Sequence, residues 1–249
     1  LRGLGVGQGD VVGIFLPMAP EAAIASHACA HLGAVQVPIF SGFAGPAVSS
    51  RLADARAKVV LTADASYRRG RLVPMKDVLD DALAHAPTVE HVIVWRRAGV
   101  DCEMSSGRDV WWDEIVADKP GTLDSVHVES ETPYLIAYTS GTTGKPKGAM
   151  RSHASHALLN FTTLLDMDLS RIDTCLLVMP LCHANSLNFA FDLFLLRGVL
   201  LYLRFQKLRP GTPVADARER KDHVHITRSH PLHHDAESKR RGQEQAQRR

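Results

Sequence analysis

The sequence predicts an α/β fold built on a doubly wound, mostly parallel sheet. Short, nearly continuous runs of Val, Ile and Leu recur along residues 11–95, and segments of helical character separate them. Parallel strands that are covered on both faces have this composition, whereas strands with one wet face alternate apolar and polar residues. Proline and glycine mark several of the boundaries between these segments.

The first strand and helix are the most clearly marked. The apolar run Val11 to Leu16 predicts a strand, and an Ala-rich segment from Glu21 to Leu32 predicts a helix. Pro20 stands where the first helical turn tolerates proline, and Gly33 stands where a helix commonly ends.

The same alternation continues along the chain. Further strands are expected at Val35 to Phe40, Lys58 to Thr62 and His91 to Trp95, and helices at Ala47 to Ala55 and Met75 to Ala84. Residues 98–132 predict a connection with one short helix, Val110 to Ala117. After it we expect a strand at Tyr134 to Tyr138, a helix at Ala154 to Leu165, a strand at Cys175 to Met179 and a helix at Asn185 to Leu196.

The net charge has opposite signs before and after Arg204. Residues 205–249 hold 11 basic and 6 acidic residues, whereas positions 1–204 hold 18 and 21, so the net charge of +2 hides an acidic body and a basic tail. Only 10 of the last 45 residues are apolar, which predicts a disordered tail. We therefore expect an α/β domain at 1–204 and a tail at 205–249, with out-of-frame translation as one hypothesis for the tail. Global charge gives no argument for nucleic acid binding.

The cysteines and the apolar stretches favour a cytoplasmic protein. The four cysteines, Cys29, Cys102, Cys175 and Cys182, are far apart and contain no C-x-x-C pair, which is typical of free thiols. The longest apolar stretch, Phe189 to Leu203, is interrupted by charges and is shorter than the ~20 residues of a membrane span. No leader pattern opens the chain, and its first residue is Leu1, which indicates a missing start or a fragment.

The strongest chemical signal is the segment Tyr138 to Gly148, between an apolar strand and a second short strand. Glycines allow the backbone N–H groups to approach an anion, four hydroxyls add donors, and two lysines add positive charge. The spacing fits neither a Walker A loop nor a dinucleotide fingerprint. The sequence therefore predicts a different kind of phosphate cradle.

This segment resembles the phosphate-binding signature of the adenylate-forming superfamily, which includes acyl-CoA synthetases. The resemblance implies ATP-dependent activation of a carboxylic or fatty acid to an acyl-adenylate and its transfer to CoA, with Mg²⁺ neutralising phosphate charge. It also implies that the β- and γ-phosphates are wrapped by Thr139, Ser140, Gly141, Thr142, Thr143, Gly144, Lys145 and Lys147. Among these, Lys145 and Thr142 are the candidates for stabilising the leaving pyrophosphate.

The resemblance covers about residues 3–204 and is strongest to the acetyl-CoA synthetase branch in its first half. In that branch an Arg-Gly-Gly-Arg element contacts CoA, so Arg68 and Arg71 are candidates for the CoA phosphates. Arg69 replaces a glycine of that element. The alternative is a solvated basic turn.

A later segment points to a longer acyl group. Met179 to Leu187 is similar to the Pro-Leu-Phe-His segment of fatty-acyl and aryl-CoA ligases, which implies that His183 gates the acyl pocket or holds the carboxylate. The alternative is a structural histidine at the start of the helix near Asn185. The two halves of the sequence therefore disagree about acyl chain length.

Three motifs of the family do not occur in these residues: an aromatic-x-x-Thr-Glu segment, a Thr-Gly-Asp segment and a C-terminal catalytic lysine. The expected function is therefore an acyl-CoA ligase impaired by truncation, with a carboxylate, ATP and CoA as small-molecule partners and no nucleic acid or membrane span. No metal-binding residue is assigned. The alternatives are a non-catalytic nucleotide-binding remnant or pseudogene product, and a nucleic-acid binder that uses the basic tail.

Overall fold

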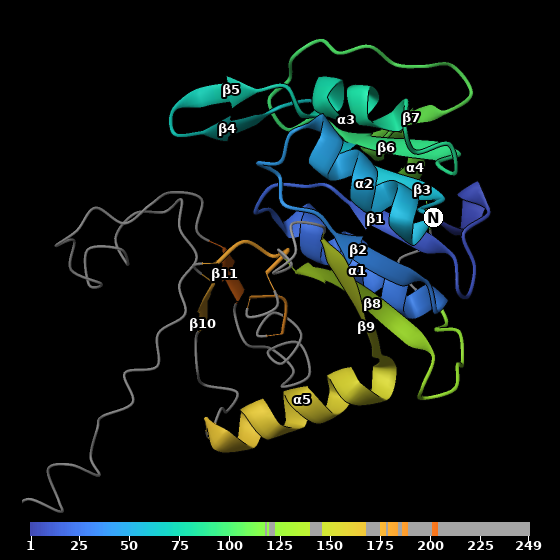
Figure 1. The fold of residues 1–249 in the computed structure, drawn as a ribbon, viewed down its shortest axis with the longest axis vertical. Coiled ribbons are helices and arrows are strands. Elements are labelled where there is room, and N and C mark those ends of the chain that lie inside the picture. The colour runs from blue at the N-terminus through green and yellow to red at the C-terminus, as the bar shows by residue number, and fades with distance from the viewer. Residues whose placement is uncertain are drawn as a thin grey trace, which may run out of the picture.

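The computed structural model contains a seven-stranded sheet with the strand order β7-β6-β3-β1-β2-β8-β9 (Figure 1). The structure describes residues 1–117, 119, 123–139, 146–167, 175–177, 179–183, 186–188 and 201–203. All pairings in this sheet are parallel except β8 with β9, which is antiparallel. The fold class predicted from the sequence, α/β with a mostly parallel sheet, is confirmed.

The helices and strands alternate through most of the chain. In chain order the strands of the large sheet are β1 (Val11–Ile14), β2 (Val35–Pro38), β3 (Val59–Ala63), β6 (His91–Trp95), β7 (Asp109–Trp111), β8 (Pro133–Thr139) and β9 (Lys147–Ser152). Two small sheets pair β4 (Ser66–Arg68) with β5 (Arg71–Val73), and β10 (Cys175–Leu177) with β11 (Leu201–Leu203). The helices are the short 3-10 helix η1 (Arg2–Leu4), α1 (Pro20–Leu32), α2 (Gly45–Ala55), α3 (Met75–Leu83), α4 (Trp112–Val116) and α5 (His153–Asp166).

The strand order explains why helices cover both faces of the sheet. From β1 the chain moves through α1 to β2, and it then returns through α2 to β3 on the other side of β1. Right-handed crossovers in opposite directions place α1 and α2 on opposite faces. The chain continues in the second direction from β3 to β6, so α3 shares the face of α2, and these two helices pack together. The order reverses at β1, whose carboxyl edge is the usual position for a ligand in such sheets.

The core lies between the central strands and their helices. Val12, Val60 and Leu52 have no exposed surface, and Phe15 is almost completely buried. At Gly13 a Cβ atom would lie 2.7 Å from Leu52 Cδ2 and 3.3 Å from Val60 Cγ2. Glycine in the middle of β1 therefore allows α2 to approach the sheet closely.

Most elements begin and end within two residues of the prediction, and two features were missed. The helix expected at Val110 to Ala117 is confirmed as the five-residue α4, but the chain forms the strand β7 just before it. The pairing of β7 with β6 extends the sheet by one edge strand, and three residues are too few to show a strand period. The hairpin of β4 and β5 was also missed.

The last part of the chain is described only in pieces. Residues 186–188 are helical, within the helix expected from Asn185, and most of the remaining positions of that helix lie outside the described residues. The expected tail, 205–249, also lies outside them. The predicted strand from Cys175 corresponds to β10.

Candidate functional site

The predicted phosphate-binding segment joins the two antiparallel edge strands β8 and β9. Thr139 ends β8 and Lys147 begins β9, and the two residues are paired in the register of the hairpin. Both are exposed. The six predicted ligands between them lie outside the described residues: Ser140, Gly141, Thr142, Thr143, Gly144 and Lys145. The structure therefore places the two ends of the segment side by side at the end of an edge hairpin.

β8 runs parallel to β2, so its last residue lies on the carboxyl edge of the sheet. The register pairs Gln36 of β2 with Leu135 of β8, and the carboxyl ends of both strands point the same way. Parallel α/β sheets bind ligands along this edge because the loops there converge above the strand ends. Thr139 and Lys147 thus occupy a position that suits an anionic ligand.

Asp64 follows β3 on the same edge, and its carboxylate is hydrogen-bonded to backbone N–H groups. Its carboxylate accepts hydrogen bonds from the N–H groups of Ala65, Arg97, Ala98 and Val100, at 2.6 to 3.1 Å. Burial would raise the pKa of Asp64, but these four donors outweigh it and the pKa is lowered. Asp64 therefore holds the loop after β6 and is not a general base.

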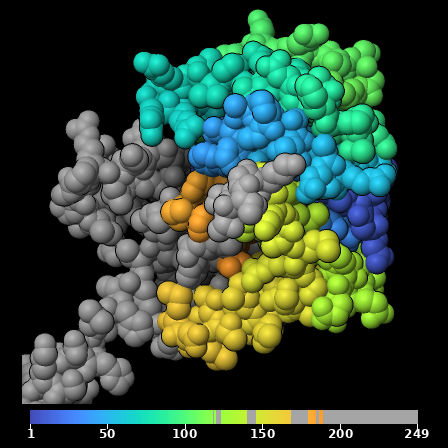
Figure 2. Space-filling model, viewed as in Figure 1, coloured from blue at the N-terminus to red at the C-terminus, as the bar shows by residue number. Residues whose placement is uncertain are grey.

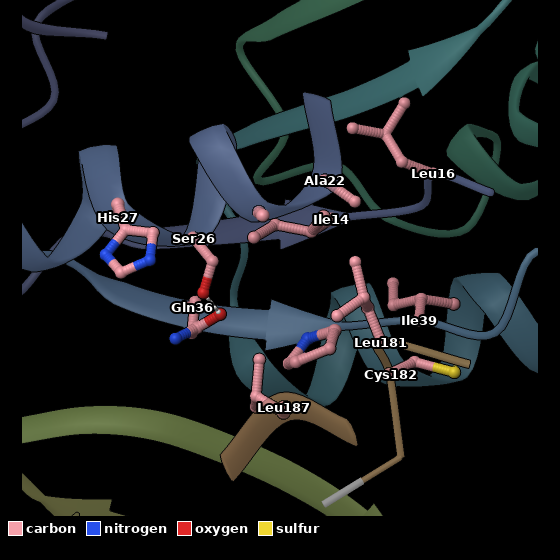
Figure 3. A pocket seen from close by; sticks show the side chains of 12 residues that line it. Ile14, Leu16, Ala22, Ser26, His27, Gln36, Ile39, Leu181, Cys182 and Leu187 are labelled. Carbon is pink, nitrogen blue, oxygen red and sulfur yellow. Dashed lines mark hydrogen bonds between the residues drawn. The ribbon is translucent and has the colours of Figure 1, made fainter. Parts of the chain in front are cut away.

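A small pocket lies between α1, β1, β2 and the segment around Leu181 (Figure 3). About 20 Å³ is open inside it, which is room for a water molecule and not for a nucleotide. Most of its wall is apolar, but Ser26 Oγ donates a hydrogen bond of 2.5 Å to Gln36 Oε1 on one side. His27 also lines the pocket, and burial, followed by the neighbouring His31, lowers its pKa to about 4.

His183 belongs to a segment that packs against the body of the domain. Figure 2 shows the described parts of this segment, residues 179–183 and 186–188, in orange between the blue body and the yellow α5. Leu181 is buried, and its N–H donates to Met18 Sδ at 3.1 Å. The carbonyl of His183 accepts from the Leu187 N–H at 3.0 Å, so His183 starts the helical turn at 186–188. His183 is exposed, and it is not one of the described residues that line the pocket.

Arg68 and Arg71 lie opposite each other in the β4–β5 hairpin, which projects from the body in Figure 1. Arg68 Nη1 donates to the Gly42 carbonyl at 3.2 Å, and its guanidinium lies 5.2 Å from the Phe40 ring. Arg71 is exposed. The hairpin begins after β3, and β1 and β2 separate β3 from β8. The predicted CoA-binding arginines therefore follow one strand of the sheet, β3, and the predicted phosphate-binding segment follows another, β8, with two strands between them.

Tyr138, the first residue of the segment, contacts two residues of α2 that were not identified from the sequence as part of the site, Arg51 and Asp54. The Tyr138 hydroxyl donates to Asp54 Oδ2 at 2.5 Å, and the Arg51 guanidinium lies 4.3 Å from the Phe43 ring and 5.5 Å from the Tyr138 ring. Burial, and then the bond to Asp54, raises the pKa of Tyr138. Arg51 and Asp54 are three apart in α2, so they share one helix face. That spacing is the one signal in the sequence that could have found them.

The described part of the chain offers no metal site. None of its groups of His, Cys, Asp and Glu brings three or more side chains close enough to hold an ion. No residue of the described ranges is therefore assigned to Mg²⁺, and we derive no step through this ion. None of the helices described here combines the length and the apolar character that a membrane crossing requires.

Residues 1–230 match the family model described as AMP-binding enzyme. The chain belongs to this family. The match includes the β8–β9 hairpin and the segment around His183, and it confirms the resemblance to adenylate-forming enzymes that the sequence indicated.

Relatives of this AMP-binding chain include several acetyl-coenzyme A synthetases. That of Rhodopirellula baltica is 49% identical over 158 residues, which are 64% of this chain and 24% of the relative. That of Methanothrix thermoacetophila is 44% identical over 174 residues, 70% of this chain and 26% of the relative. The solved acetoacetyl-CoA synthetase from Streptomyces lividans superposes with a TM-score of 0.74 at 25% identity, over 82% of this chain and 31% of that one. The chain thus spans about a quarter of the length of the curated relatives it matches.

Proposed function

We propose that this chain supplies the triphosphate-binding part of an AMP-forming acid–CoA ligase. The observation that carries the proposal is the pairing of Thr139 with Lys147 at the open end of the β8–β9 hairpin, on the carboxyl edge of the sheet. The family match and the acetyl-CoA synthetase relatives support the same reaction class.

The reaction has two steps. A carboxylate oxygen attacks the α-phosphorus of ATP, a new P–O bond forms, and the bond between the α-phosphorus and its bridging oxygen breaks to release pyrophosphate. The sulfur of CoA then attacks the acyl carbonyl, AMP leaves with the bonding electrons, and the thiol proton passes to solvent. Hydroxyl, N–H and ammonium donors of residues 139–147 would stabilise the charge that develops on pyrophosphate.

The proposed acid is short. The names of the relatives, acetyl- and acetoacetyl-CoA synthetase, favour this choice over the longer acyl group that the segment around His183 indicates. Within the proposal, Arg68 and Arg71 bind CoA phosphate and His183 lies near the acyl group. Because Arg68 already bonds to Gly42, the exposed Arg71 is the more available cation.

The proposal is tested by the binding of inorganic pyrophosphate and ATP to the 249-residue chain, measured by isothermal titration calorimetry. Lys147→Ala is expected to weaken pyrophosphate binding about tenfold, since it removes one charge-assisted contact. Lys119→Ala is the matched control because Lys119 is also an exposed lysine and lies outside the segment. Equal affinities for the two variants, or no binding by the unchanged chain, would contradict the proposal.

An exchange assay separates a complete reaction from binding alone. The aromatic-x-x-Thr-Glu and Thr-Gly-Asp segments, which hold the adenine and the ribose in the family that the sequence resembles, do not occur in these residues. We therefore expect little acetate-dependent ATP–pyrophosphate exchange from this chain. Strong exchange would show that these residues suffice for catalysis and would overturn that expectation. Binding without exchange also fits the alternative function, a nucleotide-binding protein without a reaction.

A further inference from the structure

We infer that Tyr138 is a positioning residue that ties the phosphate-binding hairpin to α2 and thereby sets the polyphosphate affinity of the chain. The inference rests on the proposed function and deepens it. It concerns described residues of three elements, namely Gly148 in β9, Tyr138 in β8, and Arg51 and Asp54 in α2.

The backbone gives the end of β8 little support from the body of the sheet. In the described residues the parallel ladder between β2 and β8 has one register pair, Gln36 with Leu135. The next four residues of β8, up to Thr139, pair with β9, which is itself the edge strand. A two-stranded ribbon of this kind is only marginally stable by itself. Side chains must therefore hold the end of the hairpin in place.

Tyr138 makes this connection with both its ring and its hydroxyl. The hydroxyl donates to Asp54 Oδ2 at 2.5 Å and lies 3.4 Å from the Arg51 carbonyl oxygen. The ring faces the guanidinium of Arg51, whose centre is 5.5 Å away. Tyr138 immediately precedes Thr139, the first predicted phosphate ligand, so a shift of its ring moves that ligand.

Arg51 is a rigid support for this ring. Its side chain is 7% exposed, its Nη1 donates to the Ala47 carbonyl at 2.6 Å, and Phe43 covers it on another side. Burial is the main cause that lowers the pKa of Arg51. A cation that is both buried and stacked on aromatic rings has little freedom to move.

Gly148 completes the arrangement from the other strand. It is the register partner of Tyr138, and a Cβ atom at this position would lie 2.8 Å from Ile136 Cγ2 and 3.2 Å from Tyr138 Cζ. The phenol ring thus lies across the bare glycine backbone. The last glycine of the segment is therefore required by the packing of Ile136 and Tyr138 over it and not by a left-handed backbone.

Two variants test the inference in the full chain. Tyr138→Phe keeps the ring and removes the bond to Asp54, and we expect pyrophosphate to bind roughly three- to tenfold more weakly. Gly148→Ala crowds Ile136 and the Tyr138 ring together, and we expect a loss of about tenfold or more. Gly3→Ala is the matched glycine control, because a Cβ atom there meets nothing within 4 Å.

A purely structural role is distinguished by a destabilised control and a second readout. Val92→Ala opens a cavity at β6, which β3, β1 and β2 separate from β8, so it should lower the thermal midpoint and leave the pyrophosphate affinity unchanged. The second readout is the rate of tryptic cleavage after Lys147, followed by mass spectrometry, which should rise in Tyr138→Phe. If Val92→Ala weakens binding as much as Tyr138→Phe does, stability explains the effect and the inference is wrong.

The two readouts also separate this inference from the proposed function. If the unchanged chain does not bind pyrophosphate, the proposed function and the ligand-positioning role both fail, whereas faster cleavage in Tyr138→Phe would still support the tie to α2. If the unchanged chain binds and both variants match it in affinity and cleavage rate, the proposed function survives and the inference is overturned.

Discussion

Lys76 and Asp109 form an ion pair that is completely shielded from solvent. Lys76 Nζ lies 2.9 Å from Asp109 Oδ2, and neither side chain has exposed surface. The pair links the first turn of α3 to the edge strand β7. Asp80 and Arg108 extend it, since Lys76 also contacts Asp80 at 2.6 Å and Arg108 Nε contacts Asp109 at 2.6 Å.

Removal of the charge at Lys76 should destabilise the fold strongly. Loss of one partner leaves a buried carboxylate with an incomplete set of donors, and such losses cost about 3–5 kcal/mol. Because Arg108 still contacts Asp109, we expect Lys76→Met to lower the free energy of unfolding by about 3 kcal/mol, measured by urea denaturation.

The matched control for this prediction is Lys58→Met. Lys58 pairs with Asp10 at 3.2 Å, but these side chains are 26% and 33% exposed. Water screens such a pair, so the expected loss is about 1 kcal/mol or less. Equal losses in the two variants would show that burial of the Lys76 pair has no special effect.

The positions of the central strands were predictable because their composition reflects burial on both faces. β1, β3 and β6 are short apolar runs, and the sequence shows them directly. β7 was not predictable because its three residues gain their strand conformation from pairing with β6. The β4–β5 hairpin was missed because Arg69–Gly70 is not one of the common Asn-Gly or Asp-Gly turns.

The candidate site was predictable only where its residues are contiguous. Thr139 and Lys147 lie in one motif, and the structure pairs them. The contact between Tyr138 and Asp54 joins positions 84 residues apart, and tertiary packing alone brings them together. Gly148 belongs to the same motif, but its packing role depends on the register between β8 and β9.

Arg69 adopts a left-handed backbone conformation in the turn between β4 and β5. Its φ is 51°, and Gly70 follows with a φ of 77°. The left-handed conformation costs a non-glycine residue about 1–2 kcal/mol. A glycine avoids this cost, but it makes the unfolded chain more flexible, which reduces the gain in stability by about 0.5–1 kcal/mol. Arg69→Gly should therefore stabilise the hairpin by about 0.5 kcal/mol, seen as slower amide exchange in residues 66–73. Gly70→Ala should accelerate exchange there, and unchanged exchange in both variants would contradict the assignment of strain to this turn.

At Gly13, close packing against α2 and the intrinsic preference of strands for alanine over glycine predict opposite effects of a substitution. Alanine normally stabilises a strand relative to glycine. Here the new Cβ atom would lie 2.7 Å from Leu52 Cδ2, and Leu52 is fully buried and cannot move aside. We expect Gly13→Ala to lower the free energy of unfolding by about 1–3 kcal/mol in urea denaturation. The same variant with Leu52→Val should recover part of that loss, and a stabilising Gly13→Ala would show that α2 is free to shift.

Two histidines, His27 in α1 and His156 in α5, have lowered pKa values. His156 is 6% exposed and its ring lies 4.8 Å from that of Tyr134. Burial, with Arg151, His153 and His27 nearby, lowers the pKa of His156 to about 4, and burial lowers that of His27 to about 4 as well. Both rings are therefore neutral in the folded protein at pH 7.

These lowered pKa values predict that the fold loses stability in mild acid. The unfolded chain takes up protons near the ordinary histidine pKa of 6.5, whereas the folded chain resists protonation until about pH 4. The free energy of unfolding should thus be highest above pH 6.5 and fall as the pH decreases towards 4. His156→Phe keeps a ring against Tyr134 and removes one titrating group, so thermal unfolding from pH 7 to 4.5 should show a shallower decline. The exposed His85→Gln serves as the control, and a decline as steep in His156→Phe as in the unchanged chain would exclude His156 as its source.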